Sequence, residues 1–269
     1  MAISKLAVVS PKAELADDVE IGPFCYVGPE VRIGGGTVLY PGVVLMGRMR
    51  IGERNVIYPH VCVGASPQDI TYRGEPAAVV IGDDNVLRES VTINRGSSKE
   101  EGVTRLGSGC YVMANSHVAH DCVVGDRAIL VNNVLLGGHV HADSGVYIGG
   151  SAAIQPFTSI GRNAYVGGLT RIVQDVPPYM LVEGHPSRVR GLNTVGLRRA
   201  GMSEVLIESL AKAYRRIYRR GRPRAEVLDE MEREDGWPDE VRHLCASLRA
   251  SAAGTSGRYR ESLRKKPPA

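Results

Sequence analysis

Residues 106–172 read LGSGCYVMANSHVAHDCVVGDRAILVNNVLLGGHVHADSGVYIGGSAAIQPFTSIGRNAYVGGLTRI, and Leu, Ile or Val returns at every sixth position, with Ala142 the one exception. The same spacing runs from Leu15 to Val63 and from Ile81 to Ile93. A small or β-branched residue usually stands two positions before each aliphatic residue. A strict short period of this kind indicates a repeat architecture and has to be interpreted before any other signal.

The six-residue period predicts a three-sided coil. It matches neither the 3.6-residue period of a helix nor the two-residue alternation of a simple strand. Three sides of six residues make a coil of about 18 residues, and successive coils pair as parallel strands about 4.8 Å apart. The aliphatic and small residues then point inward into a narrow column, which suits a chain with only 5% aromatic residues. We therefore expect a mainly β, parallel β-helix of about nine coils from Leu15 to Pro177.

Two stretches break the period and are predicted to leave the prism as loops. In the first, residues 66–78, Asp69 and Glu75 fall on inward positions that an apolar column does not accept. In the second, residues 94–105, the phase slips by one residue. Long loops on a regular scaffold often carry function, and the alternative is that they are tolerated surface insertions.

The period ends near Pro177 and the composition changes, so we divide the chain into a β-helix (1–190) and an α-helical domain (191–269). Residues 183–186 are expected to be a linker. Amphipathic spacing predicts helices over 202–220, 224–233 and 238–250, and the polar tail from 254 onward is expected to fray. The chain has no membrane-spanning run, no signal-peptide pattern and no CxxC motif. These features predict a cytoplasmic protein.

A group of histidines is the candidate catalytic site. Counting 18 residues along one corner places His120 beside Gly138 and Asp121 beside His139, and His117 falls nearby on the surface. An outward histidine is suited to general-base chemistry. A glycine amide with no side chain to shield it is suited to oxyanion binding. Asp121 is expected to orient an imidazole, that of His139.

Two other interpretations of the histidine group remain. A single histidine on the outer face of a repeat prism is usually a solvated side chain without a function. A zinc site, as in hydratases built on similar prisms, is disfavoured because no third ligand has suitable spacing and the cysteines point inward. We predict no metal and no cofactor.

The sequence resembles the UDP-N-acetylglucosamine O-acyltransferase family of hexapeptide-repeat proteins over essentially its whole length. The resemblance is carried by IGPFCYVGP (21–29), PQDITYRGEP (67–76), IGDDNVLRESVTINRG (81–96), NSHVAHDCVVG (115–125) and VQDVPPY (173–179). It implies a left-handed β-helix and a homotrimer with active sites in clefts between subunits. The implied reaction moves a 3-hydroxyacyl chain from acyl carrier protein to the glucosamine 3-hydroxyl of UDP-N-acetylglucosamine, the first step of lipid A biosynthesis.

The resemblance also implies individual roles. His120 corresponds to the general base and Gly138 to the oxyanion donor, with Asp121 beside them. Gly168 corresponds to the position that determines the length of the acyl chain. The residues implied to bind the sugar, its phosphates and the uridine are Gln68, Asp69, His117, His139, Gln155, Asn193 and Arg199.

The chain departs from the family pattern mainly where the nucleotide is held. These departures are Thr71 for a lysine, Asn94 for a histidine, Gln155-Pro156 for a His-Gln pair, Val195 for an acidic residue and Ala200 for an arginine. They leave open the nucleotide sugar, a 3-hydroxyl or 3-amino acceptor, and the acyl length. A related acyltransferase with another acceptor and a non-catalytic trimeric nucleotide-sugar binder therefore remain alternatives.

A basic run follows in the helical domain, comprising Arg215, Arg216, Arg219, Arg220, Arg222 and Arg224. We expect it to dock the acidic acyl carrier protein, the alternative being a solvated face. Nucleic-acid binding is not expected, because Tyr214 and Tyr218 lie on the apolar side of the helix pattern.

Overall fold

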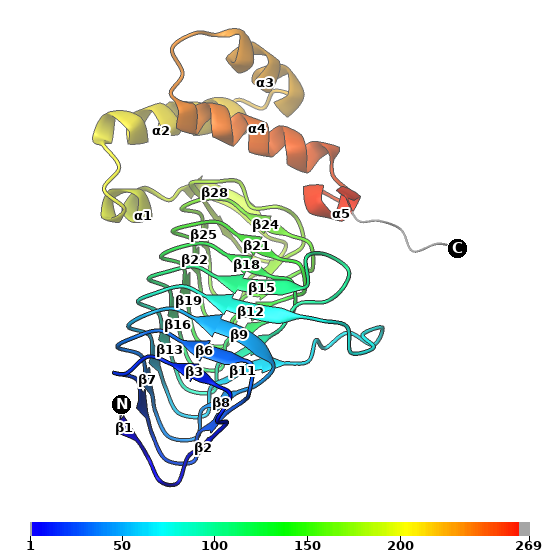
Figure 1. The fold of residues 1–269 in the computed structure, drawn as a ribbon. Coiled ribbons are helices and arrows are strands. Elements are labelled where there is room, and N and C mark those ends of the chain that lie inside the picture. The colour runs from blue at the N-terminus through cyan, green and yellow to red at the C-terminus, as the bar shows by residue number, and fades with distance from the viewer. Residues whose placement is uncertain (1, 264–269) are drawn as a thin grey trace.

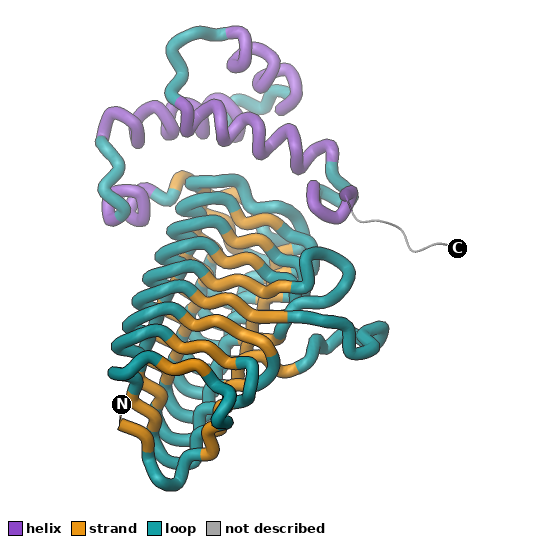
Figure 2. The backbone as a smooth tube through the Cα atoms, viewed as in Figure 1, coloured by secondary structure: helices purple, strands orange, loops and turns teal. Residues whose placement is uncertain are grey.

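The computed structural model describes residues 2–263 as a left-handed parallel β-helix with a helical cap at its C-terminal end (Figures 1 and 2). The prism has three faces, each a sheet of short strands, and the chain passes from face 1 to face 2 to face 3 in every coil.

Face 1 contains β1 (Ala2–Ile3), β4 (Glu20–Ile21), β7 (Val38–Leu39), β10 (Val56–Ile57), β13 (Val86–Leu87), β16 (Tyr111–Val112), β19 (Ile129–Leu130), β22 (Tyr147–Ile148), β25 (Tyr165–Val166), β27 (Met180–Glu183) and β28 (Arg188–Leu192). Face 2 contains β2 (Val8–Val9), β5 (Tyr26–Val27), β8 (Val44–Leu45), β11 (Cys62–Ala65), β14 (Thr92–Asn94), β17 (His117–Val118), β20 (Leu135–Leu136), β23 (Ala153–Ile154) and β26 (Arg171–Ile172). Face 3 contains β3 (Glu14–Leu15), β6 (Val31–Ile33), β9 (Arg48–Ile51), β12 (Ala78–Ile81), β15 (Val103–Leu106), β18 (Val123–Val124), β21 (His141–Ala142) and β24 (Ser159–Ile160).

The core is the apolar column that the six-residue period predicts. Val118 pairs in register with Leu136, and Leu136 pairs with Ile154 on the next coil. These aliphatic side chains are buried, as are the small residues between them, such as Cys122 and Ala128. Burial of apolar surface stabilises the prism by about 25 cal/mol for each Å² removed from water, and every coil contributes to this free energy.

The prism begins at Ala2, within the domain predicted over residues 1–190 but before Leu15, from which the coils were counted. Ile3 and Val9 already form strands in phase with Leu15, so a further coil precedes those counted. Ile3 is 39% exposed because no coil stacks beneath it. The end coil therefore keeps the period but lacks the burial that elsewhere accompanies it.

Both loops leave the prism at the corner between faces 2 and 3. They run over residues 66–77 and 95–102, somewhat shorter than predicted, because Ala78, Asn94 and Val103–Arg105 pair within strands. Strand partners are eighteen residues apart along most of the prism, but Val56 pairs with Val86 across the first loop and Thr92 with His117 across the second. The parallel strand pairing between coils thus continues beneath each loop.

The residues expected to be a linker form a turn instead. β27 and β28 are antiparallel, and β28 extends to Leu192, beyond the predicted boundary at residue 190. The cap then contains α1 (Thr194–Arg199), α2 (Glu204–Tyr218), α3 (Arg224–Arg233), α4 (Asp239–Ala253) and α5 (Tyr259–Leu263).

The cap has its own core, which includes Leu210, Val227 and Leu244. Ser203 caps α2 by accepting a hydrogen bond from the Leu206 N–H. The expectation that the tail frays is wrong up to residue 263, because α5 packs back onto the prism; residues 264–269 lie outside the described part. None of the helices in residues 2–263 has the length and apolar character needed to cross a membrane.

Candidate active site

The predicted histidine patch lies at the corner between faces 2 and 3, the corner from which both loops project. His120 and Asp121 form the turn between β17 and β18. Asp121 and His139 have φ angles of 58° and 63°, a left-handed conformation that turns the chain sharply from face 2 to face 3. Each corner thereby presents its turn residues at a fixed repeat along the prism.

The His120 imidazole lies directly against Gly138, as the eighteen-residue spacing predicts. A Cβ atom at Gly138 would stand 2.7 Å from both Cε1 and Nε2 of the ring, so a side chain there would collide with His120. Within residues 2–263 the Gly138 N–H donates no hydrogen bond. A bare amide and an imidazole are thus held side by side.

Asp121 orients His120, and the prediction that it orients His139 is wrong. Its Oδ2 lies 2.9 Å from His120 Nδ1 but 3.9 Å from His139 Nδ1. The left-handed turn directs the carboxylate back to its sequence neighbour, under the second loop, where Ser97 donates from its N–H (2.8 Å) and Oγ (2.6 Å). Burial raises the pKa of Asp121, but the hydrogen bonds from His120 and Ser97 outweigh it and hold this pKa below its usual value. Asp121 is therefore an ionised acceptor.

His139 is fixed by ring contacts on both sides. It stacks on Phe157 with centroids 4.3 Å apart and meets the His120 ring edge-on at 5.0 Å. Its Nδ1 lies 3.2 Å from Glu100 Oε1 with the geometry of an ion pair rather than a hydrogen bond.

Sequence reasoning missed Ser97, Glu100 and Phe157. Phe157 stands eighteen residues after His139, so the same counting would have found it. Ser97 and Glu100 lie in a loop outside the repeating coils, so counting in steps of eighteen residues cannot locate them.

Asp69 and His117 also reach this corner with partners from the chain itself. Lys99 Nζ of the second loop lies 2.6 Å from Asp69 Oδ2 of the first, and the Thr71 N–H and hydroxyl donate to Oδ1. Burial raises the pKa of Asp69, but Lys99 and Thr71 outweigh it and the pKa falls below the usual range. His117 Nδ1 lies 2.8 Å from Thr92 Oγ1, and burial together with His120 lowers the pKa of His117. Gln68 is exposed.

Other predicted residues lie elsewhere within one chain. Gln155 is on the coil after Gly138 at the same corner and is half-buried. Gly168 is beside Gly150 at the corner between faces 1 and 2. Asn193 and Arg199 line a cavity at the corner between faces 3 and 1, and the Asn193 side chain is already engaged as the N-cap of α1. Within one chain, Gly168, Asn193 and Arg199 therefore lie at other corners than His120, whereas Gln155 shares its corner.

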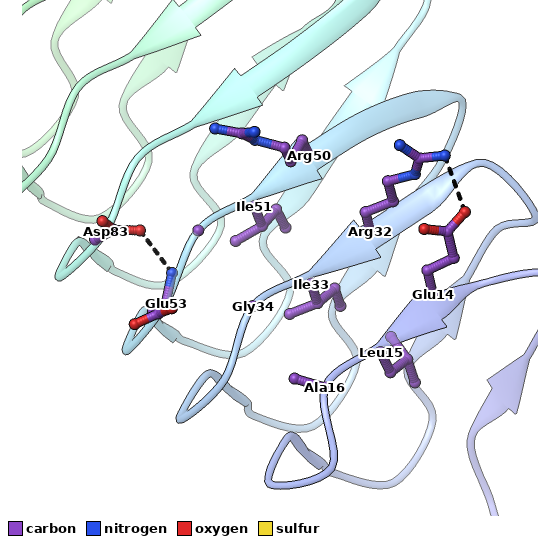
Figure 3. A pocket seen from close by; sticks show the side chains of 11 residues that line it. Glu14, Leu15, Ala16, Arg32, Ile33, Gly34, Arg50, Ile51, Glu53 and Asp83 are labelled. Atoms are coloured by element: carbon purple, nitrogen blue, oxygen red, sulfur yellow. Dashed lines mark hydrogen bonds and ion pairs between the residues drawn. The ribbon is translucent and has the colours of Figure 1, made fainter.

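Ligand atoms of His120, Asp121 and His139 lie within 4.8 Å of one another, a spacing that a cation could use. The Asp121 carboxylate, however, already accepts hydrogen bonds from both His120 and Ser97. A separate cleft near the N-terminus, lined by Glu14, Arg32, Asp83 and their neighbours, contains none of the predicted site residues (Figure 3).

Known proteins are similar to this chain over most of its length. Residues 175–256 match the family model described as UDP N-acetylglucosamine O-acyltransferase, domain 2, and residues 104–138 match the bacterial transferase hexapeptide model. An acyl-(acyl-carrier-protein)–UDP-N-acetylglucosamine O-acyltransferase from Anaeromyxobacter sp. strain Fw109-5 is 47% identical, covering 94% of this chain and 99% of the relative.

Solved structures agree with this likeness. UDP-N-acetylglucosamine O-acyltransferase from Moraxella catarrhalis superposes with a TM-score of 0.87 at 40% identity, covering 91% of this chain and 96% of the other. UDP-N-acetylglucosamine acyltransferase from Bacteroides fragilis superposes with a TM-score of 0.89 at 34% identity, covering 92% and 96%.

Proposed function

Because this chain belongs to the family of UDP-N-acetylglucosamine O-acyltransferases, we propose that the corner around His120 carries its acyl transfer, with His120 as the general base. The protein is an enzyme that transfers an acyl chain from acyl carrier protein to UDP-N-acetylglucosamine. We place this transfer at the first step of lipid A biosynthesis, with a 3-hydroxyacyl donor chain and the glucosamine 3-hydroxyl as acceptor.

The contact between His120 and Asp121 supports the base assignment. An ionised carboxylate only accepts hydrogen bonds, so the proton on the His120 ring resides on Nδ1, which donates to Asp121 Oδ2 over 2.9 Å. Nε2 then carries the lone pair, on the side of the ring that faces Gly138. This nitrogen takes the proton from the sugar hydroxyl as its oxygen attacks the thioester carbonyl carbon.

The placement of Gly138 supports the second half of the reaction. As the C–O bond forms, negative charge develops on the former carbonyl oxygen. The Gly138 N–H, which donates no hydrogen bond within residues 2–263, is available to bind it. When the intermediate collapses, the C–S bond breaks and the carrier thiol leaves with the proton that His120 had taken. The ester product and the free thiol balance the reaction without a covalent enzyme intermediate.

The remaining site residues lead us to propose a homotrimer. Asp69, His117, His139, Gln155 and Gln68 gather on the His120 corner and would hold the sugar and its phosphates. Asn193, Arg199 and Gly168 lie at the other two corners, so a cleft between subunits is needed to bring them to the same substrate. Uridine binding by Asn193 and Arg199 and chain-length selection by Gly168 follow from that arrangement.

For the carrier protein, we propose docking on the basic run from Arg215 to Arg224, which spans the end of α2 and the start of α3. Arg216 pairs with Glu230 and Glu234, and Arg222 pairs with Glu230, so these two charges are neutralised within the cap. Within residues 2–263, Arg215, Arg219, Arg220 and Arg224 form no ion pair with a carboxylate. Arg219 contacts Tyr214 and Arg224 lies over the Tyr218 ring, so all four charges remain to attract an acidic partner. We also propose a cytoplasmic location, where acyl carrier protein is available.

The test is the product formed by wild type and His120→Ala from acyl carrier thioesters and UDP-N-acetylglucosamine, analysed by mass spectrometry. We expect an O-acyl product and a loss of kcat of about 10²-fold or more in the variant. His60→Ala is the matched control, since His60 is an exposed corner histidine with a φ of 63° on a distant coil. Retention of a tenth of the activity by His120→Ala would remove it from the base role, and faster acylation of the 3-amino analogue of the sugar nucleotide, assayed in parallel, would show an amine acceptor.

A further inference from the structure

The C-terminal segment, residues 254–263, returns to the prism and is held there by backbone and side-chain hydrogen bonds. The Asp175 N–H donates to the Gly257 carbonyl (2.8 Å), and the Tyr259 N–H donates to Asp175 Oδ2 (2.8 Å). Arg258 donates to the Val173 carbonyl over 2.7 Å. Figure 1 shows α5 on the side of the prism from which the second loop projects. The segment is therefore a fixed platform rather than a free tail.

From this platform Arg260 reaches the catalytic corner. Its Nη2 lies 2.8 Å from Glu100 Oε1, and the same oxygen lies 3.2 Å from His139 Nδ1. The side chains of Arg260 and Glu100 are 20% and 30% exposed, and that of His139 is 4% exposed. One carboxylate oxygen thus joins the helical cap to an imidazole that touches the His120 ring.

Glu100 also connects Arg260 to the second loop, residues 95–102. Ser97 in the same loop supplies two of the hydrogen bonds that hold Asp121. Burial raises the pKa of Glu100, but the contact with His139 and the charge of Arg260 outweigh it, so the pKa lies below its usual value and the carboxylate is charged. Removing Arg260 would leave the partly buried Glu100 carboxylate without its guanidinium partner and would take away one of the contacts that hold the loop, beside those of Ser97 and Lys99.

We propose that Arg260 is a positioning residue that, through Glu100, sets His139 and the second loop for binding of the sugar nucleotide. This rests on the proposed role of His139 in holding the substrate. The helical cap thereby contributes to the catalytic corner of its own chain, in addition to any contact it makes with the carrier protein.

The experiment compares full-length wild type with Arg260→Ala, Arg260→Lys, Glu100→Gln and the Glu100→Gln/Arg260→Ala double variant. For Arg260→Ala we expect KM for UDP-N-acetylglucosamine to rise about tenfold, while kcat and KM for the acyl carrier protein stay within about threefold. Arg260→Lys should recover most of this loss, because a lysine keeps the charge. In the Glu100→Gln background, removal of Arg260 should add less than about twofold, since Arg260 acts through Glu100.

Arg249→Ala is the matched control, because Arg249 pairs with Asp229 and Glu232 within the cap, away from Glu100. Its KM should be that of wild type. An unchanged KM in Arg260→Ala, multiplicative effects in the double variant, or an equal effect of Arg249→Ala would overturn the proposal. Calorimetry of UDP-N-acetylglucosamine binding to the same variants should show about the same tenfold loss of affinity. This measurement tests Arg260 even if wild type shows no acyl transfer. Absence of acyl transfer in wild type would instead count against the proposed function.

Discussion

Gly138→Ala tests the active-site geometry most directly. The backbone of Gly138 does not have a positive φ, so alanine meets no conformational penalty there, and the new methyl group interacts chiefly with the His120 ring. The Cβ would stand 2.7 Å from two ring atoms, whereas ordinary contact begins at 3.4 Å. The imidazole must therefore retreat by about 0.7 Å. A displacement of this size at a reacting group reduces turnover by about 10²-fold, equivalent to about 2.7 kcal/mol in the activation barrier.

The assay is steady-state acyl transfer with both substrates varied, together with thermal unfolding. We expect kcat to fall by about 10²-fold with little change in melting temperature, since the site is at a corner and not in the column. Gly150→Ala is the matched control: Gly150 has the same position in its hexad, and its nearest neighbours would lie at 3.4 Å or more from a Cβ. If Gly138→Ala kept kcat within about threefold of Gly150→Ala, the close approach of His120 to the glycine amide would have no catalytic meaning.

Two further predictions concern charge. Asp121→Asn should lower kcat by about 10²- to 10³-fold without unfolding the protein, because an amide in place of an ionised acceptor no longer fixes the Nδ1–H tautomer of His120; an unchanged kcat in steady-state kinetics would contradict this. Burial, aided by the positive charge of Arg260, lowers the pKa of His141 from 6.5 to about 4. The unfolded chain then binds more protons than the folded one between these values, so stability present above pH 6.5 should be lost as the pH falls toward 4. The loss is about 2 kcal/mol after allowing for solvent screening at this half-buried ring. Urea unfolding at a series of pH values should show this slope in wild type and a flatter one in His141→Asn; parallel curves would show that His141 has no part in it.

The regular part of the molecule could be predicted well because the coil repeats by a fixed translation. Once Leu, Ile and Val mark every sixth residue, a residue and the one eighteen positions later are neighbours. This is why His120 could be placed beside Gly138 from sequence, and why Phe157 could have been placed on His139. The nine coils counted from Leu15 leave out the first coil, although Ile3 and Val9 keep the period and Ala7 stands two positions before Val9.

The amino-acid order alone was sufficient for the prism, its apolar column and the corner where a base and a bare amide meet, because periodic burial brings residues eighteen positions apart into register; the left hand of the coil came from the family resemblance. It was not sufficient for the partners that complete the corner. Ser97, Lys99 and Glu100 lie in a loop outside the repeating coils, and Arg260 lies 160 residues from Glu100. Contacts of that kind depend on where the chain returns in space, and so does the choice of Asp121 for His120 over His139, which a single left-handed turn determines.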